Sequence, residues 1–143
     1  MKLIVCVDDN NGMLFNHRRQ SQDRSLRERI LQLTAGSRLW MNRYSAKQFK
    51  SAKQFKSIEA PQIIVDNDLL TKAAAGDYCL VEDIDTAPYE HLIEEIILFK
   101  WNRKYPADLY FSIPLDKNGW KLAYAADFAG FSHEKITEEV YAK

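Results

Sequence analysis

The first apolar segment of the chain is short and ends abruptly in polar residues. Residues 3–7 are Leu-Ile-Val-Cys-Val, and residues 8–12 are Asp-Asp-Asn-Asn-Gly. A short apolar run with β-branched residues is typical of a buried strand. Asp, Asn and Gly favour tight turns because they tolerate left-handed backbone. The pattern therefore predicts a buried strand over residues 3–7 that ends in a turn.

A polar segment and then an amphipathic segment follow this strand. Residues 13–20 lack a periodic apolar pattern, so we expect a long polar loop there. Within residues 21–34, Leu26, Ile30 and Leu33 recur at positions i, i+4 and i+7 opposite a charged face. This spacing predicts a surface helix with one buried stripe. The loop would then lie at the carboxyl end of the first strand, where open α/β sheets bind ligands.

The ends of this helix have recognisable capping residues. Ser25 and Glu28 have the spacing of a capping box, and Asp23 is a second candidate for the N-cap. Gly36 follows the last apolar residue and suits the left-handed position after a helix.

The rest of the chain alternates between strand-like runs and short helical segments. Strands that alternate with helices indicate parallel βαβ units, whereas the last segments follow one another as strands and indicate antiparallel pairing. We therefore expect an α/β fold in a single domain over residues 1–143, with a mixed, mainly parallel central sheet flanked by helices and antiparallel C-terminal strands. The nearly continuous apolar run at 95–101 predicts a strand inside the sheet. Further strands are predicted over residues 38–42, 62–65, 78–81, 120–124 and 135–141, and further helices over 66–75 and 87–94.

A hexapeptide is repeated in tandem. Residues 45–50 are Ser-Ala-Lys-Gln-Phe-Lys, and residues 51–56 repeat them. A solenoid requires at least three longer repeats, so this duplication is not one. We interpret it as an insertion of one copy that lengthens a helix or bulges from it.

Composition and charge limit the classes of function. The apolar share is 46%, the formal net charge is zero and the sequence pI is about 6.8. This balance disfavours a general nucleic-acid binder, which usually has a basic excess. No signal peptide or apolar run near the roughly 20 residues of a membrane span is present, so we expect a cytoplasmic protein with a small-molecule ligand and no membrane partner. Cys6 and Cys79 lie in strand-like runs and are expected to be buried thiols. The oligomeric state is left open.

Several short motifs resemble the dihydrofolate reductase fold. Residues 8–13 resemble the turn after that family's first strand, which opens its mobile active-site loop. Residues 40–45, Trp-Met-Asn-Arg-Tyr-Ser, resemble its second strand and its Gly-Arg-x-Thr cofactor-phosphate turn, with Asn42 in place of glycine. The resemblance covers nearly the whole chain and rests on the order of the motifs. The other motifs, in the order of that fold's first helix and last three strands, are Leu33-Thr34, Pro106-Ala107-Asp108 with Phe111, Trp120-Lys121-Leu122, Asp127-Phe128 and Thr137-Glu138-Glu139-Val140-Tyr141.

The resemblance implies an NADPH-dependent reductase of a pterin-like heterocycle. The family's catalytic carboxylate lies early in the first helix, where Asp23 is the nearest candidate. As a buried carboxylate with a raised pKa, Asp23 would protonate or orient the heterocycle; as an N-cap it would accept amide hydrogen bonds instead. The resemblance assigns the contacts with cofactor phosphate to Asn42, Arg43, Tyr44 and Ser45.

One departure from the family weakens the cofactor motif. The family follows its central strand with a Gly-Gly pair that meets the cofactor's phosphates, but here Val81 is followed by Glu82, Asp83, Ile84 and Asp85. Carboxylates repel a pyrophosphate, and without glycine the backbone cannot approach it closely. The spacing of these carboxylates also matches no calcium loop, so no metal is expected.

The alternative is a noncatalytic or differently catalytic protein on the same fold that binds a small anion or a nucleotide. Arginine forks near the start of a helix bind anions well. The candidate ligand-binding residues are Asp8, Met13, His17, Arg18, Arg19 and Arg24.

The histidines do not indicate a hydrolase. His91 and His133 are expected on the surface, and Ser132-His133-Glu134 cannot form a triad because neighbouring side chains of a strand point to opposite faces. The His-x-His-x-Asp-His motif of a ribonuclease Z is absent from the sequence, which argues against that activity.

Overall fold

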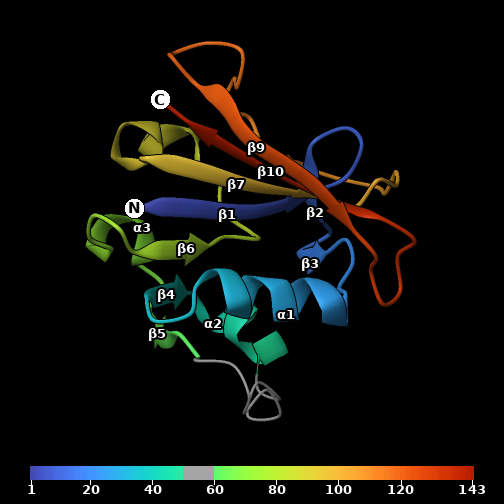
Figure 1. The fold of residues 1–143 in the computed structure, drawn as a ribbon, viewed down its shortest axis with the longest axis horizontal. Coiled ribbons are helices and arrows are strands. Elements are labelled where there is room, and N and C mark those ends of the chain that lie inside the picture. The colour runs from blue at the N-terminus through green and yellow to red at the C-terminus, as the bar shows by residue number, and fades with distance from the viewer. Residues whose placement is uncertain (50–59) are drawn as a thin grey trace.

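The computed structural model describes residues 1–49 and 60–143 (Figure 1). A seven-stranded sheet has the order β5-β4-β6-β1-β7-β10-β9. Its first five strands are parallel, whereas β10 is antiparallel to both β7 and β9. The predicted mixed, mainly parallel sheet with antiparallel C-terminal strands is confirmed. The strands are β1 (Lys2–Val7), β4 (Arg38–Met41), β5 (Gln62–Val65), β6 (Tyr78–Leu80), β7 (Glu95–Lys100), β9 (Lys121–Phe128) and β10 (Ile136–Ala142).

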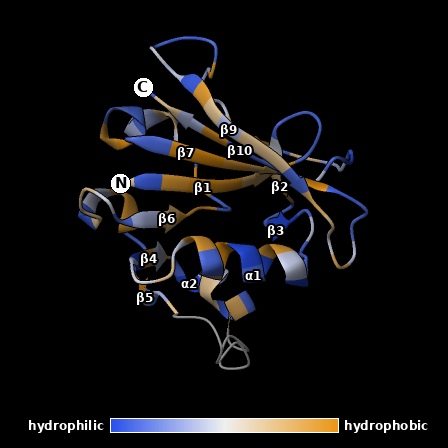
Figure 2. Cartoon of the chain, viewed as in Figure 1, coloured by the Kyte–Doolittle hydropathy of each residue, from blue (hydrophilic) through white to orange (hydrophobic). Residues whose placement is uncertain are grey.

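The strand β1 is the middle strand, and its alternating side chains enter two different cores. Leu3, Val5 and Val7 pack in one buried cluster, and Ile4 packs in the other, against α1 (Arg24–Leu33). β1 and β7 are hydrophobic along most of their length in Figure 2, and their side chains enter both cores because both strands lie inside the sheet. The expectation of an interior strand over residues 95–101 is confirmed.

The segment 13–20 is not a loop, contrary to the prediction. It forms β2 (Gly12–Phe15) and β3 (Arg18–Arg19), which pair with β8 (Leu109–Tyr110) in a small second sheet. Asn16 and His17 connect β2 to β3 with φ values of 50° and 61°. Two successive residues with positive φ are what a two-residue type I′ hairpin turn requires, and Asn tolerates this conformation well. Figure 1 places this hairpin beyond the carboxyl end of β1.

The helices are shorter than predicted. α1 begins at Arg24 instead of residue 21, because the Asp23 side chain accepts hydrogen bonds from the amides of Ser25 and Leu26 as the N-cap; the Ser25–Glu28 capping box is therefore wrong. Gly36 has a φ of 73°, as expected after a helix. The predicted helix 66–75 is a single turn and the predicted helix 87–94 is a 3₁₀ helix. The remaining elements are α2 (Arg43–Ala46), η1 (Lys47–Phe49), α3 (Leu69–Lys72) and η3 (Ala87–Leu92).

Two further expectations concern the hexapeptide repeat and the membrane. The first copy begins in α2 and η1, whereas the second copy, 51–56, lies outside the described residues. Across 1–49 and 60–143, no helix is both long and apolar enough to cross a membrane.

Candidate functional site

The carboxyl end of β1 is held by the carboxylate of Asp8. Its Oδ1 accepts hydrogen bonds from the amides of Asn10 (2.9 Å) and Gly12 (2.7 Å), and its Oδ2 accepts one from the amide of Tyr105 (3.0 Å). Burial alone would raise the pKa of Asp8, but these amide hydrogen bonds lower it. Asp8 is only 2% exposed. It therefore positions the turn after β1 and Tyr105, and it is not itself open to a ligand.

A cleft of about 270 Å³ lies between the hairpin and the segment that follows β7. Arg18 is exposed there and, among the described residues, has no carboxylate partner within 4.0 Å. Phe15 and Tyr105 add aromatic surface, and Phe15 is 47% exposed. This cleft, which we call the hairpin cleft, is lined by Phe15, Asn16, Arg18, Arg19, Gln20, Tyr105 and Pro106.

Arg19 also lines the hairpin cleft, and its positive charge is balanced by the carboxylate of Glu82. Its Nε lies 2.9 Å from Oε2 of Glu82, and its guanidinium lies 4.5 Å from the centre of the Tyr44 ring. The Arg19 amide donates to the Tyr44 hydroxyl (2.6 Å), and Gln48 donates to Glu82 (2.9 Å). Burial would lower the pKa of Arg19, but Glu82 raises it. The acidic turn after β6 therefore serves as the partner of Arg19.

Asp23 is buried and accepts hydrogen bonds from two directions. Besides capping α1, it accepts from the amides of Phe131 (3.0 Å) and Ser132 (2.9 Å) in the β9–β10 connection. Burial alone would raise its pKa, but these hydrogen bonds and one from His133 lower the pKa of Asp23 well below its usual range. Of the two alternatives for Asp23, the N-cap is confirmed, whereas the raised pKa that the catalytic alternative assumed is not found.

His133 completes a chain of hydrogen bonds that starts at Asp23. Its Nδ1 lies 2.9 Å from Oδ2 of Asp23, and its Nε2 lies 3.0 Å from Oγ of Ser21 and 3.1 Å from the hydroxyl of Tyr105. The ring stacks on Trp101 with a centroid distance of 4.6 Å. His133 is 4% exposed, so its expected surface position is wrong. The β9–β10 connection folds back onto the start of α1, which buries the ring.

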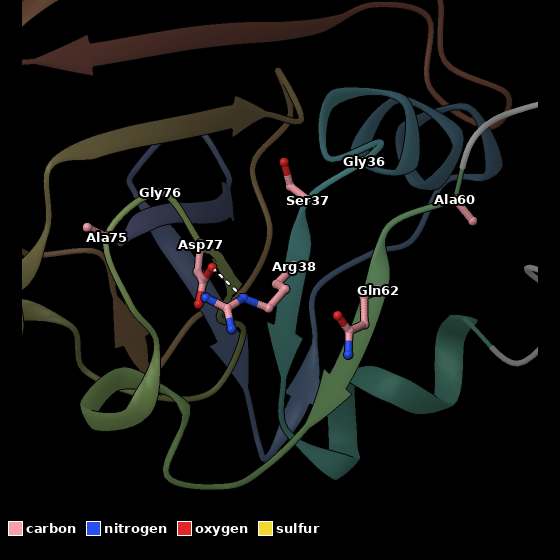
Figure 3. A pocket seen from close by; sticks show the side chains of 8 residues that line it. All are labelled: Gly36, Ser37, Arg38, Ala60, Gln62, Ala75, Gly76 and Asp77. Atoms are coloured by element: carbon pink, nitrogen blue, oxygen red, sulfur yellow. Dashed lines mark hydrogen bonds and ion pairs between the residues drawn. The ribbon is translucent and has the colours of Figure 1, made fainter.

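A second cavity lies at the other end of the sheet. It measures about 450 Å³ and opens at the amino ends of β4 and β5, with Gln62 on its wall (Figure 3). Its charged pair is satisfied, because Arg38 Nε lies 2.9 Å from Oδ1 of Asp77, and the two side chains point toward one another in Figure 3. Ligands of open α/β sheets bind at the carboxyl ends of the strands, so we place the candidate site at the hairpin cleft.

Comparisons with known proteins identify the architecture. No family model matches the sequence, and no curated protein matches it. Among solved structures, the chain is similar to a dihydrofolate reductase from Enterococcus faecalis in complex with NADP(H) and RAB-propyl. The match has a TM-score of 0.65 and covers 99% of this chain and 94% of that chain. The chain has a dihydrofolate reductase-like fold. The sequence identity is 8%, so the similarity shows the fold alone.

Within this dihydrofolate reductase-like fold, two of the four residues expected to contact cofactor phosphate, Asn42 and Tyr44, have internal partners for their side chains. Asn42 accepts from the amide of Ser45 (2.9 Å) and donates to Asp83 (2.8 Å), and Ser45 is completely buried. Tyr44 lies against Arg19. Arg43 has an exposed side chain and is the most accessible of the four.

The other candidates for ligand binding are dispersed. Met13 is 4% exposed and belongs to the core. His17 is exposed in the hairpin turn outside the lining of the hairpin cleft. Arg24 is exposed and faces Glu28 one helical turn away, at 3.4 Å. Of the six residues predicted to bind the ligand, only Arg18 and Arg19 line the hairpin cleft.

Sequence reasoning missed three residues at this end of the sheet: Ser21, Tyr105 and His133. A topological signal existed for His133, because β10 runs antiparallel to β7 and therefore starts at the edge where β7 and β1 end. Neither Ser21 nor Tyr105 stands in a motif that would indicate such a role. In the described residues, no group of three His, Cys, Asp or Glu side chains is arranged to hold a metal ion.

Proposed function

We propose that this protein binds a small anionic ligand with a flat apolar portion in the hairpin cleft, and that it does not reduce a heterocycle with NADPH. The observation that carries the proposal is Arg18, an exposed guanidinium at the rim of a concave site that also contains Phe15 and Tyr105. Guanidinium groups bind carboxylates and phosphates through paired hydrogen bonds. Aromatic walls with a few polar groups are typical of small-molecule sites.

The charges around the cleft support this division of roles. Arg19 is held by Glu82, so it shapes the wall, whereas Arg18 is available to an incoming anion. Glu82 and Asp83 occupy the turn after β6, where two carboxylates disfavour a pyrophosphate. The low pKa of Asp23 keeps its carboxylate ionised, so it has no proton to give to a heterocycle.

The second candidate is NADPH-dependent reduction of a pterin-like heterocycle. The match to a dihydrofolate reductase in complex with NADP(H) covers nearly the whole chain, and Arg43 is exposed after β4. Asp23 and the segment from Asn42 to Ser45 would then act as the resemblance implies. We rank this candidate second because Ser45 is buried and Glu82 stands where glycine is expected.

Thermal denaturation with ligand panels separates the two candidates. A ligand that binds only the folded state stabilises it by about 2.7 kcal/mol at 100 times its Kd. We expect aromatic carboxylates or nucleoside monophosphates to raise the Tm and NADPH at millimolar concentration to leave it unchanged. A rise with NADPH but with none of the small anions would favour the reductase instead.

A variant pair tests the site itself. Arg18→Ala should weaken binding of the anion identified in the panel by about tenfold or more, as loss of a charge-assisted hydrogen bond predicts. Arg24→Ala is the matched control, because Arg24 is also an exposed arginine but does not line the hairpin cleft. Isothermal titration calorimetry measures both affinities. Equal affinities for the two variants would contradict the proposal.

A further inference from the structure

The side chains of Asp23, His133 and Ser21 form a continuous line of hydrogen bonds. Asp23 Oδ2 lies 2.9 Å from His133 Nδ1, and His133 Nε2 lies 3.0 Å from Ser21 Oγ. We propose that Ser21 is a nucleophile, His133 its general base and Asp23 a positioning residue, and that together they hydrolyse an ester of the anionic ligand. The inference rests on the proposed function, because the hairpin cleft supplies the substrate site.

The carboxylate of Asp23 determines which nitrogen of His133 holds the proton. An ionised carboxylate accepts only, so Nδ1 must carry hydrogen and donate to Oδ2. The Nε2 lone pair then points toward Ser21, as a general base requires. Stacking on Trp101 and burial at 4% exposure hold the ring in this orientation. Gly130 permits the approach, because a Cβ there would lie 2.8 Å from Oδ2 of Asp23.

The hydroxyl of Tyr105 lies near His133 Nε2 as well and could stabilise an oxyanion. Both Ser21 Oγ and the Tyr105 hydroxyl lie near Nε2, at 3.0 and 3.1 Å. One lone pair accepts one hydrogen bond well, so only one hydroxyl proton is taken up by His133. When Ser21 donates to Nε2, the Tyr105 proton is free to stabilise the oxyanion that forms on a substrate carbonyl.

The position of Tyr105 connects this chemistry to the hairpin cleft. Tyr105 lines the cleft together with Arg18, while its hydroxyl reaches His133. An ester whose anionic group binds Arg18 would have its carbonyl near Tyr105, whose hydroxyl shares His133 Nε2 with Ser21. Ser21 also borders a small cavity of about 20 Å³. That volume is about what one water requires, which suits the second half of a hydrolysis.

The reaction balances with water as the only co-reactant. Ser21 Oγ attacks the carbonyl carbon while its proton moves to His133 Nε2. The tetrahedral intermediate then collapses, the bond to the alcohol oxygen breaks, and Nε2–H protonates the departing alkoxide. Water, deprotonated by His133 Nε2, attacks the carbonyl carbon of the acyl-Ser21 ester. The bond to Ser21 Oγ then breaks, Nε2–H returns the proton to Oγ, and the carboxylic acid is released. The net change is one ester and one water to one acid and one alcohol.

Labelling of the full chain with an alkyl fluorophosphonate tests the nucleophile. The reagent is neutral, so its reaction does not depend on binding of an anion by Arg18. We expect the wild-type protein to gain one covalent adduct at Ser21, located by peptide mass spectrometry, and Ser21→Ala to gain none. Ser112→Ala is the matched control and should label as the wild type does, because Ser112 is exposed and its hydroxyl donates to Asp85 instead of a histidine. No adduct on the wild type, or an equal adduct on Ser21→Ala, would overturn the inference.

Turnover of p-nitrophenyl acetate tests the roles of the other two residues. Ser21→Ala should lower kcat by about 10³-fold or more. Asp23→Asn should lower kcat with KM unchanged, and imidazole should restore activity to His133→Ala, neither of which a purely structural cluster would produce. Circular dichroism of each variant verifies that it is folded. If the protein binds the anion through Arg18 but does not hydrolyse the ester, the triad is rejected and the proposed function stands. If it hydrolyses the ester at Ser21 but Arg18→Ala binds the anion as the wild type does, the proposed function is rejected and the triad stands.

Discussion

Replacing Asp23 with alanine should destabilise the protein far more than replacing an ordinary N-cap. The variant loses the cap of α1, which is worth about 1 kcal/mol. It also leaves the buried Nδ1–H of His133 without an acceptor, at a cost of about 1–3 kcal/mol, and removes the acceptor of the Phe131 and Ser132 amides. Water can reach these two amides, so each adds less. We expect a total loss of about 4 kcal/mol in the free energy of unfolding.

Asp68 provides the control for this measurement. It is the N-cap of α3, but its side chain makes no capping hydrogen bond and is exposed. Asp68→Ala should therefore cost less than about 0.5 kcal/mol. Urea unfolding with an unchanged m-value gives both free energies. An Asp23→Ala cost no larger than that of Asp68→Ala would refute the reasoning.

The stability difference between the wild type and Asp23→Ala should also depend on pH. The pKa of Asp23 is lower in the folded state than in the unfolded state, so the folded state binds its proton less readily. Its contribution is thus fully present above the unfolded value of about 3.9 and is lost as pH falls below it. The stability difference between wild type and Asp23→Ala should be constant from about pH 6 to 7 and should narrow toward about pH 3. A difference that widens on acidification would contradict the sign.

Three further changes test other parts of the fold. Arg29→Ala should cost about 3 kcal/mol in urea unfolding, because Arg29 makes two hydrogen bonds, of 2.6 and 3.0 Å, to Glu138, which would remain buried and unpaired; a cost below about 0.5 kcal/mol would contradict this. Gly130→Ala should cost about 1–3 kcal/mol, since its Cβ would lie 2.6 Å from the carbonyl oxygen of His133; an unchanged Tm would count against the close packing of this loop on the start of α1. Burial raises the pKa of Cys79 to about 12, so a thiol reagent at about pH 8 should modify it only as fast as the protein unfolds, and rapid modification of the native protein would show that the strand is accessible.

The main sheet was predictable because its signals are local. The run at residues 3–7 is continuously apolar, and burial on both faces of the middle strand demands this. The hairpin was missed because its turn is Asn16–His17 instead of Asn-Gly, and because β3 has only two residues and a partner, β2, that pairs with the distant β8. Its stability comes from tertiary pairing, which local composition does not reveal.

The candidate site was predictable only in part, for a related reason. Arg18 stood out as a cation near the end of the first strand, and the structure places it at the cleft. The partner of Arg19 is Glu82, which lies 63 residues away, and the partner of Asp23 is His133, which lies 110 residues away. No short-range pattern links such pairs. The sequence alone therefore shows where the charged residues are but not which of them pair with each other in the fold.

The long separation between Asp23 and His133 has a consequence for the order of assembly. His133 lies in the connection just before β10, which pairs with β7, so its contact with Asp23 depends on a long-range strand pairing. Long-range pairing is slow compared with local helix formation, and ribosomes add only about 5–20 residues per second. In a chain that has formed β1 and α1 but not β10, Asp23 caps α1 but has no contact with His133. The line of hydrogen bonds from Asp23 through His133 to Ser21 is therefore complete only when the β9–β10 connection has packed onto the start of α1.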